Sequence, residues 1–139
     1  MNAATPLYTR DILRLAADIP GQRSFAEIDG PALRSPACGS RVAMRVTIDA
    51  DRRVTSVEQA VEACAFGQAA AALVGMHAVG VDSAQAKAAL ARVEQWLDQD
   101  IPEAWPGLAA LGPARSRRGR HGAILLPFRA LVAAIEAAA

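Results

Sequence analysis

The stretch VAMRVTID at residues 42–49 decides the fold, because apolar and polar side chains alternate along it. Its apolar positions are every second residue: Val42, Met44, Val46 and Ile48. A period of two is typical of a β-strand with one buried face. A register slip of one residue would bury Arg45 and Asp49 at a high cost in free energy. The pattern therefore predicts a strand whose Val42 face packs against helices.

Two shorter strands are predicted on either side of this one in the sequence. The polar turn at residues 49–52 is followed by the β-branched run 54–57, which predicts the partner strand of a hairpin. Residues 32–37 predict a third strand, and Pro36 marks its end or an edge because proline has no amide hydrogen to donate. The sequence thus predicts a small antiparallel three-stranded sheet in the N-terminal half.

Helices are predicted before and after the sheet from apolar spacing and from capping and helix-breaking residues. The first, residues 9–18, is capped by Thr9 and carries an apolar stripe that includes Ile12 and Leu13. Three others are expected at residues 67–78, from a cap at 82 or 83 to about 97, and from about 126 into the tail. This order favours a single α+β domain over residues 1–139, with helices packed on one face of the sheet.

The composition is that of a soluble globular protein, since 53% of the 139 residues are hydrophobic and 21% are charged. The net charge of +1 gives no general attraction to nucleic acid or to an anionic membrane. No apolar run reaches the roughly 18 residues that span a bilayer, and residues 1–10 lack the pattern of a signal peptide. We therefore expect a cytoplasmic protein that binds neither membrane nor nucleic acid, with reduced cysteines.

The two cysteines are the main candidates for chemistry. Cys38 lies in a turn flanked by proline and glycine, and Cys64 lies just before the second predicted helix. The positive end of a helix dipole favours the thiolate, which is the form that binds metal or attacks sulfur, so Cys64 is expected to be the more reactive. Their separation matches no zinc-ribbon spacing, so only the fold could bring them together. Both could also be small buried apolar side chains.

The two histidines are weaker candidates. His77 has the surroundings of an ordinary helical side chain, whereas His121 follows the arginine-rich run 115–120 and could ligate a metal or lie in a solvated connector. This run lacks interleaved aromatic residues, so it is a weak candidate for a nucleic-acid surface and could equally face an acidic protein. The sequence contains no glycine-rich phosphate loop and no Ser-His-Asp pattern that would indicate an enzyme.

Several segments together resemble one known family. The turn SPACGS at residues 35–40, followed by the strand 42–48, resembles the iron–sulfur cluster scaffold family of IscU, SufU and NifU N-terminal domains. The hairpin at 51–54, the turn CAFG at 64–67 and the helix stop VGVD at 79–82 follow in the order found in that family. Tyr8 and the first helix match its opening helix, so the resemblance covers nearly the whole chain.

The resemblance implies a fold and a function. Family members have an α+β sandwich in which three cysteines and an aspartate form one site at the end of the sheet. That site accepts sulfur from a cysteine desulfurase, assembles a [2Fe–2S] cluster for recipient proteins, and can hold zinc instead. Carried over to this chain, Cys38 and Cys64 would be the ligands of iron or zinc, and Cys64 would be the persulfide acceptor. The protein would then be a scaffold and not an enzyme.

The sequence departs from the family pattern at two positions. Ser40 stands where the family has its aspartate, and Ala123 stands where it has its third cysteine. His121, two residues earlier, is a weak third metal-ligand candidate. Two thiolates do not complete the four ligands that zinc or a [2Fe–2S] cluster takes, so a homodimer or a partner would complete the site. The alternatives are a zinc-dependent sulfurtransferase that relays persulfide sulfur, and a metal-free interaction domain.

Overall fold

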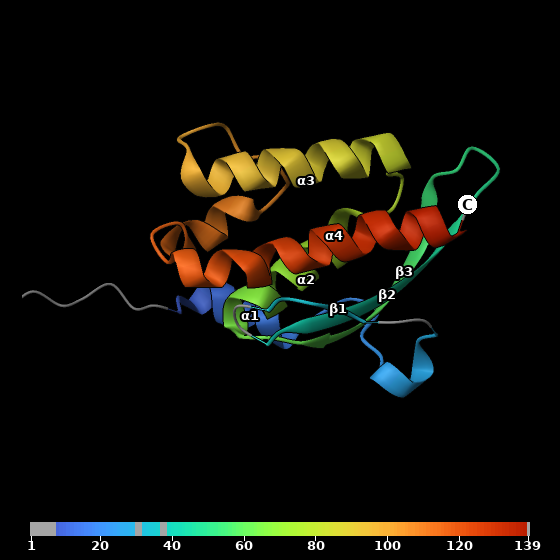
Figure 1. The fold of residues 1–139 in the computed structure, drawn as a ribbon, viewed down its shortest axis with the longest axis horizontal. Helices are drawn as coiled ribbons and strands as arrows, with labels where there is room; N and C mark the ends of the chain where they lie inside the picture. Colours follow the sequence, from blue (N-terminus) through green and yellow to red (C-terminus); the bar gives the residue numbers. More distant parts are fainter. Residues whose placement is uncertain (1–7, 30–31, 37–38, 139) are drawn as a thin grey trace, which may run out of the picture.

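The computed structural model describes residues 8–29, 32–36 and 39–138, and Figure 1 shows the path of the chain. Its elements in chain order are α1 (Arg10–Ala17), η1 (Phe25–Glu27), β1 (Leu33–Arg34), β2 (Arg41–Ile48), β3 (Val54–Glu62), α2 (Ala65–His77), α3 (Ser83–Asp98), η2 (Leu108–Ala114), η3 (Arg118–Arg120) and α4 (His121–Ala138). The η elements are short 3₁₀ helices. The predicted α+β class with an antiparallel three-stranded sheet is confirmed.

The sheet has the order β1-β2-β3, and both pairs of neighbouring strands are antiparallel. Val42 and Val46 are buried on the face that meets the helices, and Met44 and Ile48 are partly buried against the core, as the alternating pattern predicts. The predicted third strand is shorter than expected, because β1 contains only Leu33 and Arg34. The chain turns directly after it, and Ser35 no longer belongs to the strand.

The opposite face of the sheet carries ion pairs in place of a helical layer. Arg45 lies opposite Glu58 across the β2–β3 ladder, and its Nη2 is 2.8 Å from the Glu58 carboxylate. This hydrogen bond holds the pKa of Glu58 below its ordinary value. Near the middle of the face, Ile28 and Phe25 cover the small side chains of β2 and β3.

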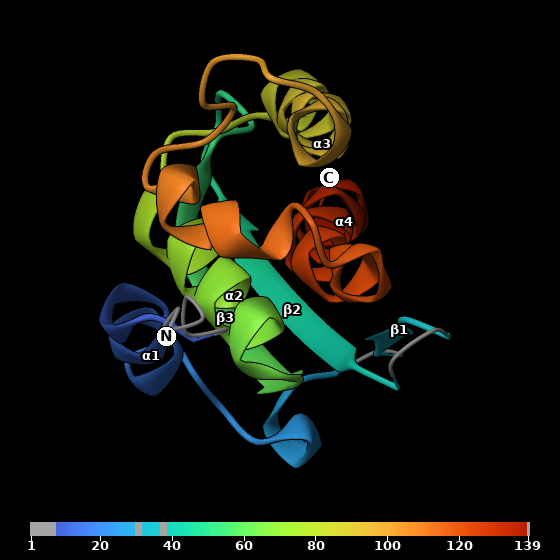
Figure 2. The ribbon, with the colours of Figure 1, turned by 90° about the vertical axis from the view of Figure 1, so that its left-hand side faces the viewer.

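Helices cover the other face of the sheet (Figure 2). Helix α2 lies between α1 and α4, and α4 also packs against β2 and α3. Four consecutive alanines of α2, residues 69–72, are fully buried, and such small side chains let neighbouring elements approach closely on several sides. Trp105 is buried against this core. It donates a hydrogen bond of 2.9 Å to the Leu73 carbonyl and makes an edge-to-face ring contact with Phe128.

Two predictions about helices are wrong in detail. In α1, Thr9 caps the helix as predicted and Ile12 is buried, but Leu13 is 51% exposed because it lies on the solvent side of this short helix. The last helix begins at His121 and not near Leu126. Gly122 and Pro127 have low helix propensity, but the burial of the first turns of α4 against its neighbours stabilises the helix by more than these two residues cost.

Helix α4 with the turn before it, Arg118–Ala138, is long and apolar enough to cross a membrane by length and composition. The prediction that no apolar stretch reaches that length is therefore also wrong. More than half of its apolar window is buried inside the fold, where the helix packs against β2, α2 and α3. This burial accounts for the apolar character of α4 as that of a core helix.

The two faces of β2 predict different responses to a charge. Val46→Asp should lower the free energy of unfolding by about 3–5 kcal/mol, because it buries an unpaired carboxylate against the helices. Thr47→Asp, on the exposed face of the same strand, should cost less than about 1 kcal/mol. Urea denaturation of both variants measures the difference, and similar losses would contradict the assignment of the faces.

Candidate functional site

The register of β2 and β3 brings the 35–40 loop and Cys64 to the same end of the sheet. Arg41, the first residue of β2, pairs with Glu62, the last residue of β3. Gly39 lies two residues before Arg41, and Cys64 lies two residues after Glu62. These two residues line one open hollow of about 200 Å³, together with Ser40, Glu62 and Ala63.

The loop that forms one wall of this hollow is closed by two backbone hydrogen bonds. The Ser35 N–H donates to the Ser40 carbonyl, and the Gly39 N–H donates to the Ser35 carbonyl, both at 2.9 Å. Gly39 has a φ of +72°, a left-handed conformation that glycine adopts without strain. Cys38 belongs to this loop in the sequence and lies outside the described residues.

Cys64 forms the opposite wall, at the N-cap of α2. Its carbonyl accepts the first hydrogen bond of the helix, from the Gln68 N–H at 2.9 Å, while its side chain makes no capping hydrogen bond. The thiol is free and the residue is partly exposed. The side chain is therefore accessible from the hollow and sits where unpaired helix N–H groups and the helix dipole favour negative charge.

The start of α4 packs directly against both walls. A methyl group on Gly67, one turn after Cys64, would lie 3.3 Å from the Cβ of Ala123 and 2.7 Å from the Cβ of Ala63. A methyl group on Gly122 would lie 2.6 Å from the Oγ of Ser35 in the loop. Three chain segments thus converge here, and Ala123, only 1% exposed, places a methyl group beside the turn that carries Cys64.

His121 is directed at a different part of the molecule. Its Nε2 lies 2.9 Å from the Arg115 carbonyl and 3.2 Å from the Ala114 carbonyl, and its Nδ1 lies 3.9 Å from a carboxylate oxygen of Asp98. It is not among the residues that line the hollow. Among the described residues, no three His, Cys, Asp or Glu side chains group closely enough to hold a metal ion. The interpretation of His121 as a ligand stays a prediction, and its contacts support a structural role.

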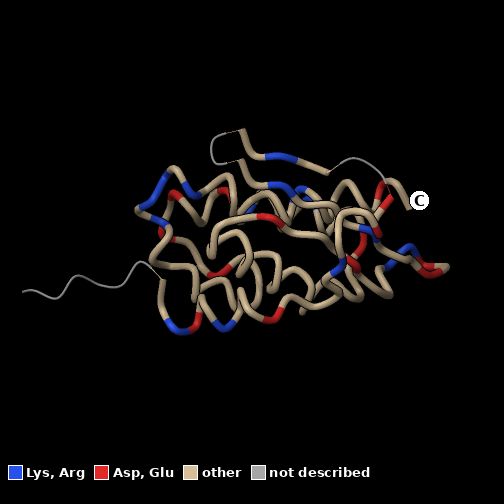
Figure 3. The backbone as a smooth tube through the Cα atoms, turned by 90° about the horizontal axis from the view of Figure 1, so that it is seen from below, with Lys and Arg blue, Asp and Glu red and all other residues tan. Residues whose placement is uncertain are grey.

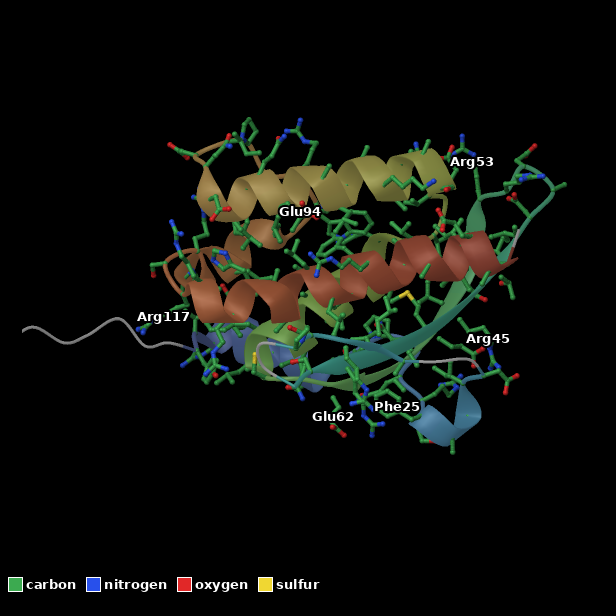
Figure 4. The ribbon with its side chains drawn as sticks, viewed as in Figure 1. Phe25, Arg45, Arg53, Glu62, Glu94 and Arg117 are labelled. Carbon is green, nitrogen blue, oxygen red and sulfur yellow. The ribbon has the colours of Figure 1, made fainter. Side chains whose placement is uncertain are left out.

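Glu62 is a site residue that the sequence reasoning missed. It lines the hollow, and one of its carboxylate oxygens lies 3.1 Å from Nη2 of Arg41. The Arg41 guanidinium in turn lies 3.8 Å above the ring of Phe25, and Figure 4 shows Glu62 and Phe25 beneath the sheet, away from the helices. Its position two residues before Cys64 was the available signal, although Glu62 lies beyond the predicted strand at 54–57.

Comparison with known proteins bears on the fold. No protein-family model matches the sequence, and no curated protein matches it. A solved structure of a nitrogen-fixing NifU-like protein, its N-terminal part, from Brucella abortus superposes with a TM-score of 0.81 at 26% identity. The match covers 95% of this chain and 94% of that one.

Two further solved structures have the same architecture. One is a proposed iron–sulfur cluster assembly scaffold protein of the SUF system from the thermophile Fervidobacterium islandicum AW-1, with a TM-score of 0.75, 16% identity, and 93% and 96% of the two chains covered. The other is a hypothetical protein with a TM-score of 0.70, 19% identity, and 94% and 97% covered. This chain has the iron–sulfur scaffold fold. The resemblance drawn from the turns at 35–40 and 64–67 is thereby confirmed.

The contact between α2 and α4 beside Cys64 predicts a strong effect of a single methyl group. Gly67→Ala should lower the free energy of unfolding by about 1–3 kcal/mol, because the added Cβ is too close to Ala63 and Ala123. Gly112→Ala is the matched control, since a Cβ there has no atom within 4 Å. Urea denaturation compares them. An equal or stabilising effect at Gly67 would show that the two helices are not packed this closely.

Proposed function

We propose that this protein is a scaffold-like component of iron–sulfur cluster assembly whose cysteines, Cys38 and Cys64, receive sulfur and hold iron. The observation that carries the proposal is the meeting of three chain segments at the hollow beside Cys64, on a fold shared with a NifU-like protein at 26% identity. Proteins of this fold class include scaffolds for iron–sulfur clusters, which supports a scaffold role here.

The pairing of the two cysteines rests on the neighbours of Cys38. Cys38 is joined by a peptide bond to Gly39, and Gly39 lines the same hollow as Cys64. Thiolates are the ligands of iron–sulfur clusters and good ligands of zinc. The two thiols are therefore proposed to act on one bound group.

Cys64 is the proposed sulfur acceptor. Its thiolate would attack the outer sulfur of a persulfide on a donor protein, such as a cysteine desulfurase, in the cytoplasm. The new bond joins the Cys64 sulfur to the transferred sulfur, and the bond between the two sulfurs of the donor persulfide breaks. The donor's inner sulfur leaves as a thiolate, which takes up the proton that the Cys64 thiol had released. Partial exposure at the mouth of the hollow gives the donor access to Cys64.

The donor set within one chain is incomplete for a cluster. Ala123 offers a methyl group beside the Cys64 turn, and Glu62 is engaged by Arg41. Ser40 brings a hydroxyl, a weaker ligand of divalent cations than a carboxylate. Since a cluster takes four ligands, the missing ones would come from a second copy or from a recipient protein. The methyl group of Ala123 also favours a second candidate function, a relay of persulfide sulfur that binds zinc or no metal.

Anaerobic reconstitution with ferrous iron and sulfide tests the proposal. We expect bound iron and sulfide, with an absorption spectrum of a cluster, and loss of both in Cys64→Ala and in Cys38→Ala. His121→Ala should retain them, because its ring contacts the 114–115 carbonyls and not the hollow. Persulfide on Cys64 without bound iron would favour the relay, and unchanged iron in the double cysteine variant would contradict both functions.

Position 123 predicts a gain of metal binding. Ala123→Cys should tighten zinc binding at least about tenfold, because a third thiol would stand beside the Cys64 turn. Ala130→Cys adds a thiol to the same helix in a different apolar cluster and should leave the affinity unchanged. Competition with a chromogenic zinc chelator measures both variants. Equal affinities in the two variants would contradict the proposed position of the site.

A further inference from the structure

Positive charge is segregated in one part of this nearly neutral chain. Between Glu103 and Glu136 the sequence has five arginines and no acidic residue, whereas the whole chain has 15 basic and 14 acidic residues. Four of these arginines lie within residues 115–120, in and before η3. Figure 3 marks the basic positions in blue along the chain.

Arg41 and Arg45 of the sheet form ion pairs, whereas the arginines at residues 115–120 form none with the described residues. Arg115 is used internally, since it donates a hydrogen bond to the Gln99 carbonyl and its guanidinium lies 5.0 Å from the ring centre of Trp96. Arg117 and Arg118 are exposed and Arg120 is half-buried, and none of the three has an ion pair or a side-chain hydrogen bond with the described residues. We refer to these three residues as the arginine turn.

The arginine turn lies one helical turn before Ala123, the α4 residue that packs against the turn carrying Cys64. Arg120 precedes Ala123 by three residues, which is about 5–6 Å along a helix of either kind. Ala123 packs on Gly67, and Gly67 follows Cys64 by three residues, again about 5 Å along the axis. Each of these steps is shorter than the screening length of about 8–10 Å in salt, so one approaching protein can contact both the turn and Cys64.

We infer that the arginine turn is a docking surface for an acidic segment of the protein that delivers sulfur to Cys64. This inference rests on the proposed function and names the chemistry of its partner. The guanidinium forks of Arg117 and Arg118 match carboxylates, which they bind in pairs of hydrogen bonds. The nearby carboxylates do not neutralise the turn, because Glu62 is engaged by Arg41 and Asp98 faces His121.

A protein fits this surface better than a nucleic acid does. The turn offers three free cations in four residues, and no aromatic residue lies between them. Nucleic-acid surfaces combine a longer basic stripe with stacking side chains, and the chain carries a net charge of only +1. An acidic patch of a few side chains matches the extent of the turn.

Thiol exchange at Cys64 tests the inference with the full chain carrying Cys38→Ala. The probe is a short oligoglutamate peptide with a terminal cysteine activated by thionitrobenzoate, and an oligoglutamine version is the neutral reference. The Cys64 thiolate attacks the peptide sulfur, forms a disulfide with it and releases coloured thionitrobenzoate, whose absorbance gives the rate. The acidic probe should react at least about tenfold faster at low ionic strength, and the advantage should vanish at high ionic strength.

Charge-reversal variants locate the effect. Arg117→Glu with Arg118→Glu should abolish the preference for the acidic probe, and the corresponding glutamine variants should reduce it. Arg52→Glu with Arg92→Glu changes the net charge equally at exposed positions outside the turn and should keep the preference. Figure 4 shows Arg117 at one end of the molecule and Arg53, the neighbour of Arg52, at the other.

Several results would overturn the inference. Equal rates for the two probes, or equal losses in both double variants, would show that the turn does not recruit acidic segments to Cys64. Tighter binding of a fluorescent single-stranded oligonucleotide than of the oligoglutamate peptide, lost in the Arg117 and Arg118 variant, would assign the turn to nucleic acid. The exchange needs only the Cys64 thiol, so its result can be interpreted even if the protein binds no iron.

Discussion

The close approach of α2 and α4 at Gly67 and Ala123 is the constraint on which the candidate site depends. A Cβ on Gly67 would lie 3.2 Å from the Ala123 carbonyl oxygen, so only glycine lets the two helices meet at this depth. Pro127 has no amide hydrogen to bond the carbonyl four residues earlier, which is that of Ala123. The first turn of α4 thereby packs on the first turn of α2, directly after Cys64, which lines the hollow.

The strand register is the second constraint, and it acts from the other side. Pairing of Arg41 with Glu62 fixes which residues leave the sheet beside each other, and the ladder from Val42 to Ile48 holds that register through its buried face. The ion pairs on the outer face also oppose a change of strand register, since a shift of one residue would move Arg45 into the core. The same alternation that builds the core thus places Gly39 beside Cys64.

The sequence correctly predicted the features that depend only on neighbouring residues. The alternation at 42–49, the cap at Thr9 and the position of Cys64 at a helix start follow from side-chain period and capping, and the structure has all three. The start of α4 was missed because the helix was expected only from about Leu126, and its first turns are held by tertiary burial that the sequence does not show. Glu62 was missed because its partner lies on the other strand.

The chemistry of the hollow depends on the charges of the side chains around it. A third thiol and an aspartate would bring negative charge that holds a metal ion tightly. In this chain a methyl group and a hydroxyl occupy those positions, while three unpaired arginines stand at the next turn. The balance of charge around Cys64 therefore moves from negative toward positive, which favours an anionic approaching surface over a retained cation. Under the proposed function, such a site would favour contact with an anionic sulfur donor, and bound iron would need further ligands from a second chain.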